Sequence, residues 1–454
     1  MTGTAVVIGA SMGGLLAARV LSEAYGTVLL VDRDPLPDGP VARRGVPQGH
    51  QLHVLLARGR EALDELFPGL SAELGALGAP LVDLHGQVHW YNDGHLMCRA
   101  ASAMVAVGTS RPLLEHRVRA RVAALPGVRF LPPAQVVGLE ATPDGRRVTG
   151  VRLAARPGGG AGATATVVAA DLVVDACGRG SRTPAWLAEL GYPAPPEEQV
   201  EVGITYVTRL YRREPHHLGG LLGLLTNAVP ARPRAAIVAA QEDGQLAVAL
   251  SGLLGERPPT DDAGLLDFAG SLVAPQVAEV LRSAVPLGPP AVMRFPASRR
   301  RRYERLRRFP AGYLVFADAL CSFNPIYGQG MTVAALQALL LRGLLAGGAG
   351  EVGRRFFRRA ARLIDGPWSI AVGTDLRFPA VAGRRSAKVR FVNAYVHRLH
   401  VAAAADPALG AAFLRVVNLI DAPAKLLRPA VVARVLRAPW RQLATRSEQT
   451  RVGR

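Results

Sequence analysis

The stretch TAVVIGASMGGLLAARVL, residues 4–21, contains the pattern that decides the fold. It begins with the β-branched run Thr4–Ile8, which is typical of a short buried strand. A glycine-rich turn follows, and the apolar residues after it predict a helix over Leu15–Ala24. A second strand is predicted over Thr27–Val31. Together they form a β-α-β unit, which leaves backbone N–H groups and the positive end of a helix at one edge of a parallel sheet.

The glycine-rich turn GASMGG suits the pyrophosphate of a dinucleotide. Gly9 permits a tight turn, and Gly14 permits the helix to pack closely on the strand. Ser11 stands where the usual GxGxxG fingerprint has its middle glycine, which weakens the motif. Asp32 ends the second strand, where its carboxylate can accept hydrogen bonds from ribose hydroxyl groups. An ordinary glycine-rich turn between a strand and a helix is the alternative.

Two later segments extend this candidate nucleotide site. ADLVVDACGRGSR is a hydrophobic strand that runs into a small-residue turn with Asp175 and Gly178. GYLVFADA is a strand that ends in Asp318, and the loop NPIYGQGM follows it. A helix that begins near Met331 directs its N-terminus at this loop, where it can stabilise negative charge on a ring system. Each segment alone is ambiguous, but three in this order indicate one nucleotide-binding site.

The rest of the chain divides into regions of different character. Residues 186–295 contain strand-like segments such as Val202–Tyr211 and Leu246–Ser251, which predicts an antiparallel sheet in a separate substrate-side domain. From about residue 376 the pattern is helical and rich in alanine, valine, leucine and arginine. We find no Ser/His/Asp order and no metal-ligand spacing, so hydrolysis and zinc chemistry are not favoured.

The composition is that of a globular protein with a strong positive charge. Lys+Arg number 54 against 35 Asp+Glu, a net charge of +19. The only lysines are Lys388 and Lys425, which indicates a GC-rich genome; an anionic partner, such as a phosphorylated cofactor, an acidic carrier protein or a lipid surface, is the alternative explanation. The three scattered cysteines give no disulfide framework, and no segment clearly spans a membrane, so we expect a cytoplasmic protein.

The sequence resembles the FAD-dependent monooxygenases of the para-hydroxybenzoate hydroxylase and squalene epoxidase type. The resemblance is closest to bacterial epoxidases of polyether-antibiotic pathways, and it covers the chain from residue 5 to about residue 340. Two specific motifs carry it, RRGVPQGHQLHVLL (Arg43–Leu56) and FNPIYGQGM (Phe323–Met331). The other shared stretches are VVIGASMGGLLAARVL, VDRDPLP, TSRPLLE (Thr109–Glu115), DACGRGSR, WLAELG and ITYVTRLY.

The resemblance implies an α/β fold with three regions. These are a Rossmann-like FAD-binding domain of the glutathione-reductase type, an inserted antiparallel-sheet substrate domain, and a C-terminal helical region. The expected boundaries are 1–85, 101–185 and 296–375 for the FAD-binding domain, 86–100 and 186–295 for the substrate domain, and 376–454 for the helical region.

The resemblance also implies which residues hold the adenosine half of FAD. Gly9, Ser11 and Gly14 would bind the pyrophosphate. Asp32 would bind the adenosine ribose, and Arg33 beside it is a further cofactor-binding candidate.

A second group is implied for the flavin half. Arg43 would lie beside the flavin, and Arg111 would contact the phosphate–ribose region. Asp175 and Gly178 would form the second dinucleotide motif of the family, and Asp318 would bind ribityl or pyrophosphate groups. The loop along the flavin would be shaped by Pro325, Gly328, Gly330 and Met331. No residue is assigned as catalytic with certainty, no metal is expected, and a solvated basic surface is the alternative for the arginines.

In such enzymes NADPH or NADH reduces FAD, O₂ adds to the flavin as a C4a-hydroperoxide, and one oxygen atom passes to the substrate. The resemblance therefore predicts epoxidation or hydroxylation of a large apolar substrate, a polyketide or isoprenoid of secondary metabolism such as antibiotic biosynthesis. A non-redox cyclase that retains FAD and a flavin-dependent reductase of isoprenoid double bonds are the alternatives. The chain lacks an N-terminal-half lysine of the kind that a flavin halogenase uses.

The substrate site is expected to have an apolar wall. The stretch Gly219–Val229 is one candidate for it, and the same residues could instead be core. The other candidates are the strand residues Val202, Ile204, Tyr206 and Leu210.

Two basic segments raise the question of partners. Ser298–Arg308 predicts a solvated face, or a landing site for an acidic carrier protein that bears the substrate or for a cofactor phosphate. Ala411–Trp440 is predicted to cover the substrate entrance with an amphipathic basic helix, which either packs on the flavin domain or contacts an anionic lipid surface. No nucleic-acid partner is expected.

Overall fold

The computed structural model describes residues 2–154, 165–347 and 352–438, and its framework is a parallel sheet. Five strands lie in the order β17-β11-β1-β2-β7, with every neighbouring pair parallel. Short apolar runs form these strands because a parallel sheet is covered on both faces. Their bounds are β1 Thr4–Ile8, β2 Thr27–Val31, β7 Val128–Phe130, β11 Leu172–Asp175 and β17 Tyr313–Val315. The carboxyl ends of β1, β11 and β17 therefore meet at one edge.

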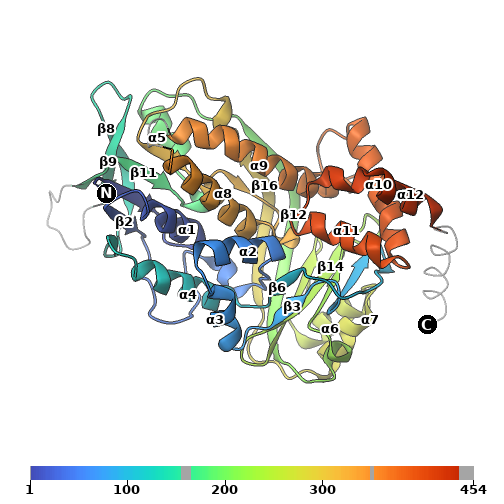
Figure 1. The fold of residues 1–454 in the computed structure, drawn as a ribbon. Helices are drawn as coiled ribbons and strands as arrows, with labels where there is room; N and C mark the ends of the chain where they lie inside the picture. Colours follow the sequence, from blue (N-terminus) through green and yellow to red (C-terminus); the bar gives the residue numbers. More distant parts are fainter. Residues whose placement is uncertain (1, 155–164, 348–351, 439–454) are drawn as a thin grey trace.

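Helices and a small antiparallel sheet cover the parallel sheet (Figure 1). Helix α1 packs against α4 and α8, and β9 packs on β11. The covering elements are α1 (Met12–Leu21), α2 (Ala57–Leu66), α3 (Leu70–Ala76), α4 (Arg111–Ala123), α5 (Thr183–Glu189), α8 (Gly330–Leu345), β8 (Val136–Ala141), β9 (Val148–Leu153) and β10 (Thr166–Ala169). The prediction of a helix over 15–24 is shifted, because the last residues of the glycine-rich turn form the first turn of α1.

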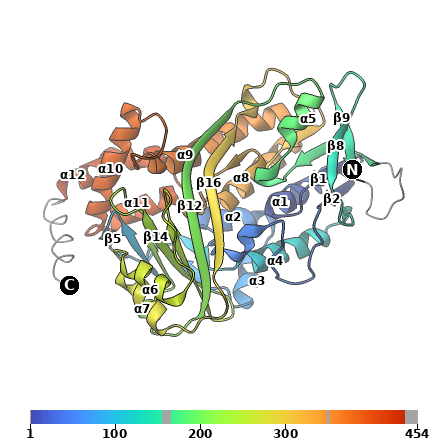
Figure 2. The same ribbon diagram turned by 180° about the vertical axis from the view of Figure 1, so that it is seen from behind.

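A mixed eight-stranded sheet forms the second layer of the molecule (Figure 2). Its order is β18-β16-β12-β15-β14-β13-β4-β5. The sequence predicted an antiparallel sheet, but strands β13 and β4 run parallel to each other. Helices α6 (Asp262–Gly270) and α7 (Pro275–Ser283) cover one face. The strands are β4 Val88–Asn92, β5 His95–Leu96, β12 Glu197–Arg212, β13 Gly223–Thr226, β14 Arg234–Gln241, β15 Gln245–Gly252, β16 Ala291–Arg301 and β18 Cys321–Ser322. Strand β16 continues across the boundary expected at 295–296.

The basic stretch Ser298–Arg308 is internal in its first half, which corrects the expectation of a solvated face for that half. Its first half belongs to β16, where Arg300 and Arg301 are buried. Acidic partners lie opposite: Glu197 pairs with Arg299 and Arg301, Glu198 with Arg302 and Arg305, and Asp365 with Arg300 and Arg302. The charges are therefore used mainly inside the fold, where β12 and helix α9 (Val352–Asp375), which packs on α8 and β17, meet β16.

The C-terminal helices pack at the far end of the eight-stranded sheet (Figures 1 and 2). They are α10 (Ala387–Ala403), α11 (Pro407–Val417) and α12 (Pro429–Arg437), and with β4 and the two-stranded sheet of β3 (Leu81–Asp83) and β6 (Val105–Val107) they bury a core of their own. Val435 of α12 is buried in this core, whereas Leu436 is 62% exposed. Helix α12 thus packs on α10 and α11 rather than on the parallel-sheet layer.

Part of the predicted C-terminal cover, including Trp440, lies outside the described residues, as do the other residues of 439–454. Among the helices of residues 2–154, 165–347 and 352–438, none has both the length and the apolar character needed to cross a membrane.

Candidate functional site

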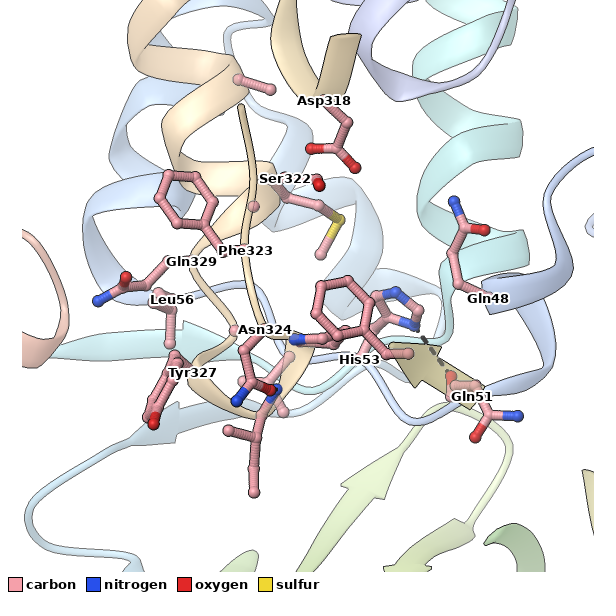
Figure 3. Close-up of a pocket in the computed structure, with 18 of the residues that line it drawn as sticks. Gln48, Gln51, His53, Leu56, Asp318, Ser322, Phe323, Asn324, Tyr327 and Gln329 are labelled. Carbon is pink, nitrogen blue, oxygen red and sulfur yellow. Dashed lines mark hydrogen bonds between the residues drawn. The ribbon is translucent and has the colours of Figure 1, made fainter. Parts of the chain in front are cut away.

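A cavity of about 1230 Å³ extends from the parallel sheet to the C-terminal helices. The β1–α1 turn, the end of β2 and the 317–331 loop line one end of it. The eight-stranded sheet and segments of α10 and α11 line the other end. Figure 3 shows its middle, where Gln51 and His53 lie across from Asp318 and the loop that carries Asn324. All three predicted nucleotide-binding segments contribute residues to this one cavity.

The β1–α1 turn has the conformation that its glycines require. Gly9 has a φ of +97°, and a Cβ there would lie 2.8 Å from the carbonyl oxygen of Ala176. A Cβ on Gly14 would lie 1.7 Å from the carbonyl oxygen of Gly9. Ser11 occupies the N-cap position, but its side chain does not cap α1. The first-turn N–H groups of α1 are therefore available to an anion at the cavity wall, which Ser11 and Gly13 line.

Asp32 lies at the end of β2 and faces the same cavity. Its Oδ2 accepts a hydrogen bond from the backbone N–H of Ala10 at 2.7 Å and lies 3.3 Å from Nη1 of Arg43. The carboxylate is therefore fixed beside the glycine-rich turn. The Arg33 side chain is 71% exposed and lines the rim of the cavity.

A buried ionic network lies behind the turn and was not predicted as a unit. Arg43 Nη2 lies 2.9 Å from Glu115 Oε1, and Arg111 Nε lies 3.1 Å from Glu115 Oε2. Ser11 Oγ donates to Glu115 Oε2 and accepts from Arg111 Nη2. Burial alone would raise the pKa of Glu115, but the charges of Arg111 and Arg43 outweigh it and lower this pKa. The sequence did contain one sign of this network: Glu115 lies one helical turn after Arg111, a spacing at which opposite charges can pair on a helix.

The two residues predicted from the second motif, Gly178 and Asp175, lie in different environments. Gly178, with a φ of +64°, lines the cavity. Asp175 is fully buried behind the cavity wall, where its Oδ2 accepts hydrogen bonds from the hydroxyl groups of Ser181 and Thr183. Asp175 therefore holds the turn in shape and does not face the cavity.

The 317–331 loop brings Asp318 to the N-terminus of α8 (Figure 3). Asp318 faces the cavity and its side chain is exposed there; desolvation by the surrounding protein raises the pKa of its carboxyl group, although Arg111 and Arg179 act to lower it. No side chain among the described residues caps α8, so the N–H groups at Gly330 and Met331 are available there. Pro325, Gly328, Gly330 and Met331 all line the cavity.

A second buried hydrogen-bond network, which the sequence did not predict, holds this loop through Asn324 and Tyr327. Asp375, at the end of α9, is fully buried. Its Oδ1 accepts hydrogen bonds from Asn324 Nδ2 at 3.0 Å and from the hydroxyl group of Tyr327 at 2.8 Å. The hydroxyl group of Tyr206 in turn donates to Asn324 Oδ1. Burial raises the pKa of Asp375 to about 6, although the hydrogen bonds from Tyr327 and Asn324 act to lower it.

We expect Asp375→Asn to change how stability depends on pH. A carboxyl group with a raised pKa favours folding below pH 3.8, and this contribution is lost as the pH rises through about 6. Between those values the wild type should lose up to about 3 kcal/mol relative to the variant, which cannot ionise there. Denaturant unfolding from pH 4 to pH 7 measures this difference. As a control, Asp267→Asn replaces an exposed carboxyl group, and its unfolding free energy should depend on pH as that of the wild type does. If the Asp375→Asn curve also ran parallel to the wild-type curve, the prediction would be wrong.

His53, in the RRGVPQGHQLH motif, faces the loop from the other side of the cavity (Figure 3). Its Nδ1 lies 2.9 Å from the carbonyl oxygen of Gln51 and therefore donates to it. Burial, reinforced by the charge of Arg111, lowers the pKa of His53 to about 4. The imidazole is thus neutral at physiological pH and places an uncharged ring at the cavity wall.

The apolar end of the cavity differs in part from the predicted wall. Leu222, Leu225 and Tyr206 line it, as expected for two of the proposed segments. Val202 and Ile204 are instead buried in a separate core cluster, and Leu210 is 37% exposed. Two groups of residues complete the wall: Trp90 and Val396, which the sequence did not indicate, and Phe413, Val416 and Leu426, which belong to the segment predicted to cover the substrate entrance.

The fold is shared with solved flavoproteins. The flavin-dependent brominase Bmp2 superposes with a TM-score of 0.69, at 14% identity, over 99% of this chain and 100% of that one. PqsL, a probable FAD-dependent monooxygenase from Pseudomonas aeruginosa, superposes with a TM-score of 0.59, at 16% identity, over 83% of this chain and 98% of that one. At such identities the likeness concerns the fold, which is mixed α/β with a parallel sheet and a second, larger sheet.

Sequence comparison gives a nearer relative. No family model matches the chain. Protein Rv3254 of Mycobacterium tuberculosis (strain ATCC 25618 / H37Rv) is 36% identical over 429 residues, which cover 92% of this chain and 90% of the relative. With that identity over nearly the whole of both proteins, and with the fold of the flavoproteins above, the chain belongs to the family of Rv3254.

Proposed function

We propose that this protein binds FAD in the cavity and is an FAD-dependent monooxygenase that uses NADPH or NADH and O₂. One observation carries the proposal: the uncapped N-termini of α1 and α8 line the same cavity of about 1230 Å³, together with the ribose-type carboxylate Asp32. A dinucleotide with an electron-accepting ring needs a ribose acceptor, an anion site and a positive helix end for the ring, in that order.

The residues present fit FAD. The pyrophosphate would bind the first turn of α1, with Ser11 and Arg111 beside it, and Asp32 would accept the ribose hydroxyl groups. The ring system would lie between His53 and the 325–330 loop, with the N-terminus of α8 toward it. With FAD so bound, the domain would be an FAD-binding domain of the glutathione-reductase type. The resemblance to PqsL and to the other flavoproteins in fold supports the assignment.

When bound, FAD supplies the redox chemistry of the reaction. The chain must place the substrate and exclude water from the reacting centre. Trp90, Leu225, Phe413 and Val416 give the substrate end an apolar wall that suits a large apolar molecule. We propose epoxidation or hydroxylation of such a substrate, in secondary metabolism of the antibiotic-forming kind.

The test uses the purified protein before any substrate is known. Non-covalent FAD should be released on denaturation in a one-to-one ratio. Anaerobic mixing with NADPH or NADH should bleach the flavin absorbance, and O₂ should restore it with consumption of O₂. Bound FAD that neither nucleotide reduces would contradict the monooxygenase and favour a non-redox cyclase. Flavin that NADPH or NADH reduces but that O₂ reoxidises only slowly would favour the reductase of isoprenoid double bonds.

Truncation after Asp406 tests the role of the C-terminal cover. It removes α11 and the segment after it, which contribute Phe413, Val416 and Leu426 to the cavity wall. We expect FAD to remain bound, because the nucleotide end of the cavity is untouched. The yield of hydrogen peroxide in a fixed time of substrate-free NADPH oxidation should rise severalfold, because water now reaches the ring.

A matched truncation after Ala438 is the control for this experiment. It keeps every cavity-lining residue that the structure describes, so its peroxide yield should equal that of the full chain. Equal yields from both truncations, at equal FAD content, would show that α11 and α12 serve only packing.

A further inference from the structure

A carboxylate–imidazole pair lies at the substrate end of the cavity, where no sequence motif indicated one. Asp93 is in the β4–β5 turn, with a φ of +52° and a side chain that is only 2% exposed. Its Oδ2 lies 2.9 Å from Nδ1 of His400 and 3.1 Å from Nδ1 of His397, both on α10. Its Oδ1 accepts a hydrogen bond from Arg377 at 2.6 Å. The turn and the C-terminal helices thus meet at one buried anion.

The pair fixes the tautomer of His400. Burial alone would raise the pKa of Asp93, but the hydrogen bonds from His397 and His400 and the charge of Arg377 outweigh it and hold this pKa well below its usual range. Since the ionised carboxylate can only accept, His400 Nδ1 carries the proton. In the neutral imidazole, Nε2 then has a free lone pair.

His400 is placed to use that lone pair, whereas His397 is not. The His400 side chain is 4% exposed and lines the cavity, and its Nε2 is buried without a hydrogen-bond partner among the described residues. The ring of Phe413 from α11 lies beside it, with centroids 4.6 Å apart and the planes at 84°. His397 shares the same carboxylate, but its side chain is 54% exposed and is not part of the cavity wall.

We propose that Asp93 and His400 form an acid–base pair that takes a proton from a hydroxyl group of the substrate. The proposal rests on the proposed function and narrows its substrate to an apolar molecule with an acidic hydroxyl, a phenol or an enol. The substrate O–H proton moves to His400 Nε2, the substrate becomes an oxyanion, and the imidazolium keeps its Nδ1–H on Asp93. The proton returns when the product leaves. An oxyanion conjugated with the carbon to be oxygenated is a better nucleophile, so the pair favours hydroxylation over epoxidation.

The charged groups around His400 support this role. Asp93 faces it from the β4–β5 turn, and Arg377, after α9, and His397, on α10, share that carboxylate. From α11 its neighbour is the uncharged ring of Phe413. The anion next to Nδ1 stabilises the imidazolium that proton transfer creates, and the apolar wall keeps water from competing for Nε2.

The test uses 4-nitrophenol as a probe, with the FAD-loaded full chain and without NADPH. In buffer acid enough to keep the free probe mostly neutral, the difference spectrum of the wild type should show the nitrophenolate band. His400→Gln should lose this band, so that the ionised fraction equals that in free solution. Asp93→Asn should weaken it severalfold, since asparagine tolerates the positive φ but leaves the imidazolium without its anion. His397→Gln, on the same helix and the same carboxylate, should keep it.

Two outcomes overturn the proposal: no nitrophenolate band with the wild type, or a band that His400→Gln retains. The FAD content of each variant shows whether it is folded. If His400→Gln does not fold, the weaker nitrophenolate band expected of Asp93→Asn still tests the proposal. Failure of the proposed function is separate, because it would appear as wild-type protein without reducible FAD. A wild type with reducible FAD but no nitrophenolate band leaves the monooxygenase standing and removes only the acid–base pair.

Discussion

Glu115→Ala should cost the FAD-free protein about 3–5 kcal/mol of unfolding free energy, because it removes the anion from a buried ionic network. Glu115 is 4% exposed, and it is the carboxylate between Arg43 and Arg111, which are each 6% exposed. Without it, two guanidinium groups remain buried, of which Arg43 keeps its ion pair with Asp32. Urea unfolding of the apoprotein measures the loss.

The cost should shrink when FAD is added. The pyrophosphate proposed to bind at the α1 turn brings negative charge beside Arg111, and so replaces part of the missing carboxylate. The surface pair Glu140–Arg152 is the matched control, because both side chains are about 40% exposed and Glu140→Ala should cost less than about 1 kcal/mol. Equal costs for the two variants, or a Glu115→Ala cost that FAD leaves unchanged, would contradict this account of the network.

Local patterns were sufficient to predict the nucleotide end of the fold. The expected strands Thr4–Ile8 and Thr27–Val31 are the observed β1 and β2, because each is a short apolar run between turn residues. Gly14 is required by a contact within the same β-α unit, with the carbonyl oxygen of Gly9, and Gly9 by its own positive φ, so their signal is local. The fold of the flavin enzymes, predicted from three such motifs, is confirmed by the superposition on Bmp2 and PqsL.

The residues that the sequence did not reveal are those whose partners are far away in the chain. Asp375 supports Asn324 across 51 positions, and Asp93 holds His400 across 307. A single buried carboxylate has no periodicity, so only the fold shows what it contacts. The converse error is Asp175: its motif is local and visible, but whether a carboxylate at a strand end faces the cavity or the core depends on hydroxyl groups that arrive with the next turn.

The sequence alone also did not show whether the arginines of Ser298–Arg308 lie on the surface or pair with carboxylates inside the fold. Ser298–Arg308 appeared as a basic surface because no acidic run adjoins it, yet its partners Glu197 and Glu198 lie on the neighbouring strand β12. Strand pairing placed them opposite: Glu197 is in register with Arg301 and Glu198 with Arg300. Cross-strand charge pairs of this kind depend on register, which the run of arginines alone does not specify.

Gly14→Ala should abolish FAD binding and cost at least about 3 kcal/mol of stability, the largest effect that we expect of a single methyl group in this chain. The new Cβ would lie 1.7 Å from the carbonyl oxygen of Gly9 and 2.8 Å from its carbonyl carbon. Both atoms belong to the backbone, so no side-chain rotation relieves the overlap. Either α1 moves away from β1, or the turn at Gly9 opens; each displaces the N–H groups that face the cavity.

Gly343→Ala is the matched control for this substitution. It is also a helical glycine, on α8, but a Cβ there meets nothing within 4 Å. Because alanine is a better helix former, we expect it to raise stability by about 0.5–1 kcal/mol and to leave FAD bound. FAD content after gel filtration and the urea midpoint give both quantities. A Gly14→Ala protein that kept its FAD would show that the turn can yield to a side chain, and the pyrophosphate would then have to bind elsewhere in the cavity.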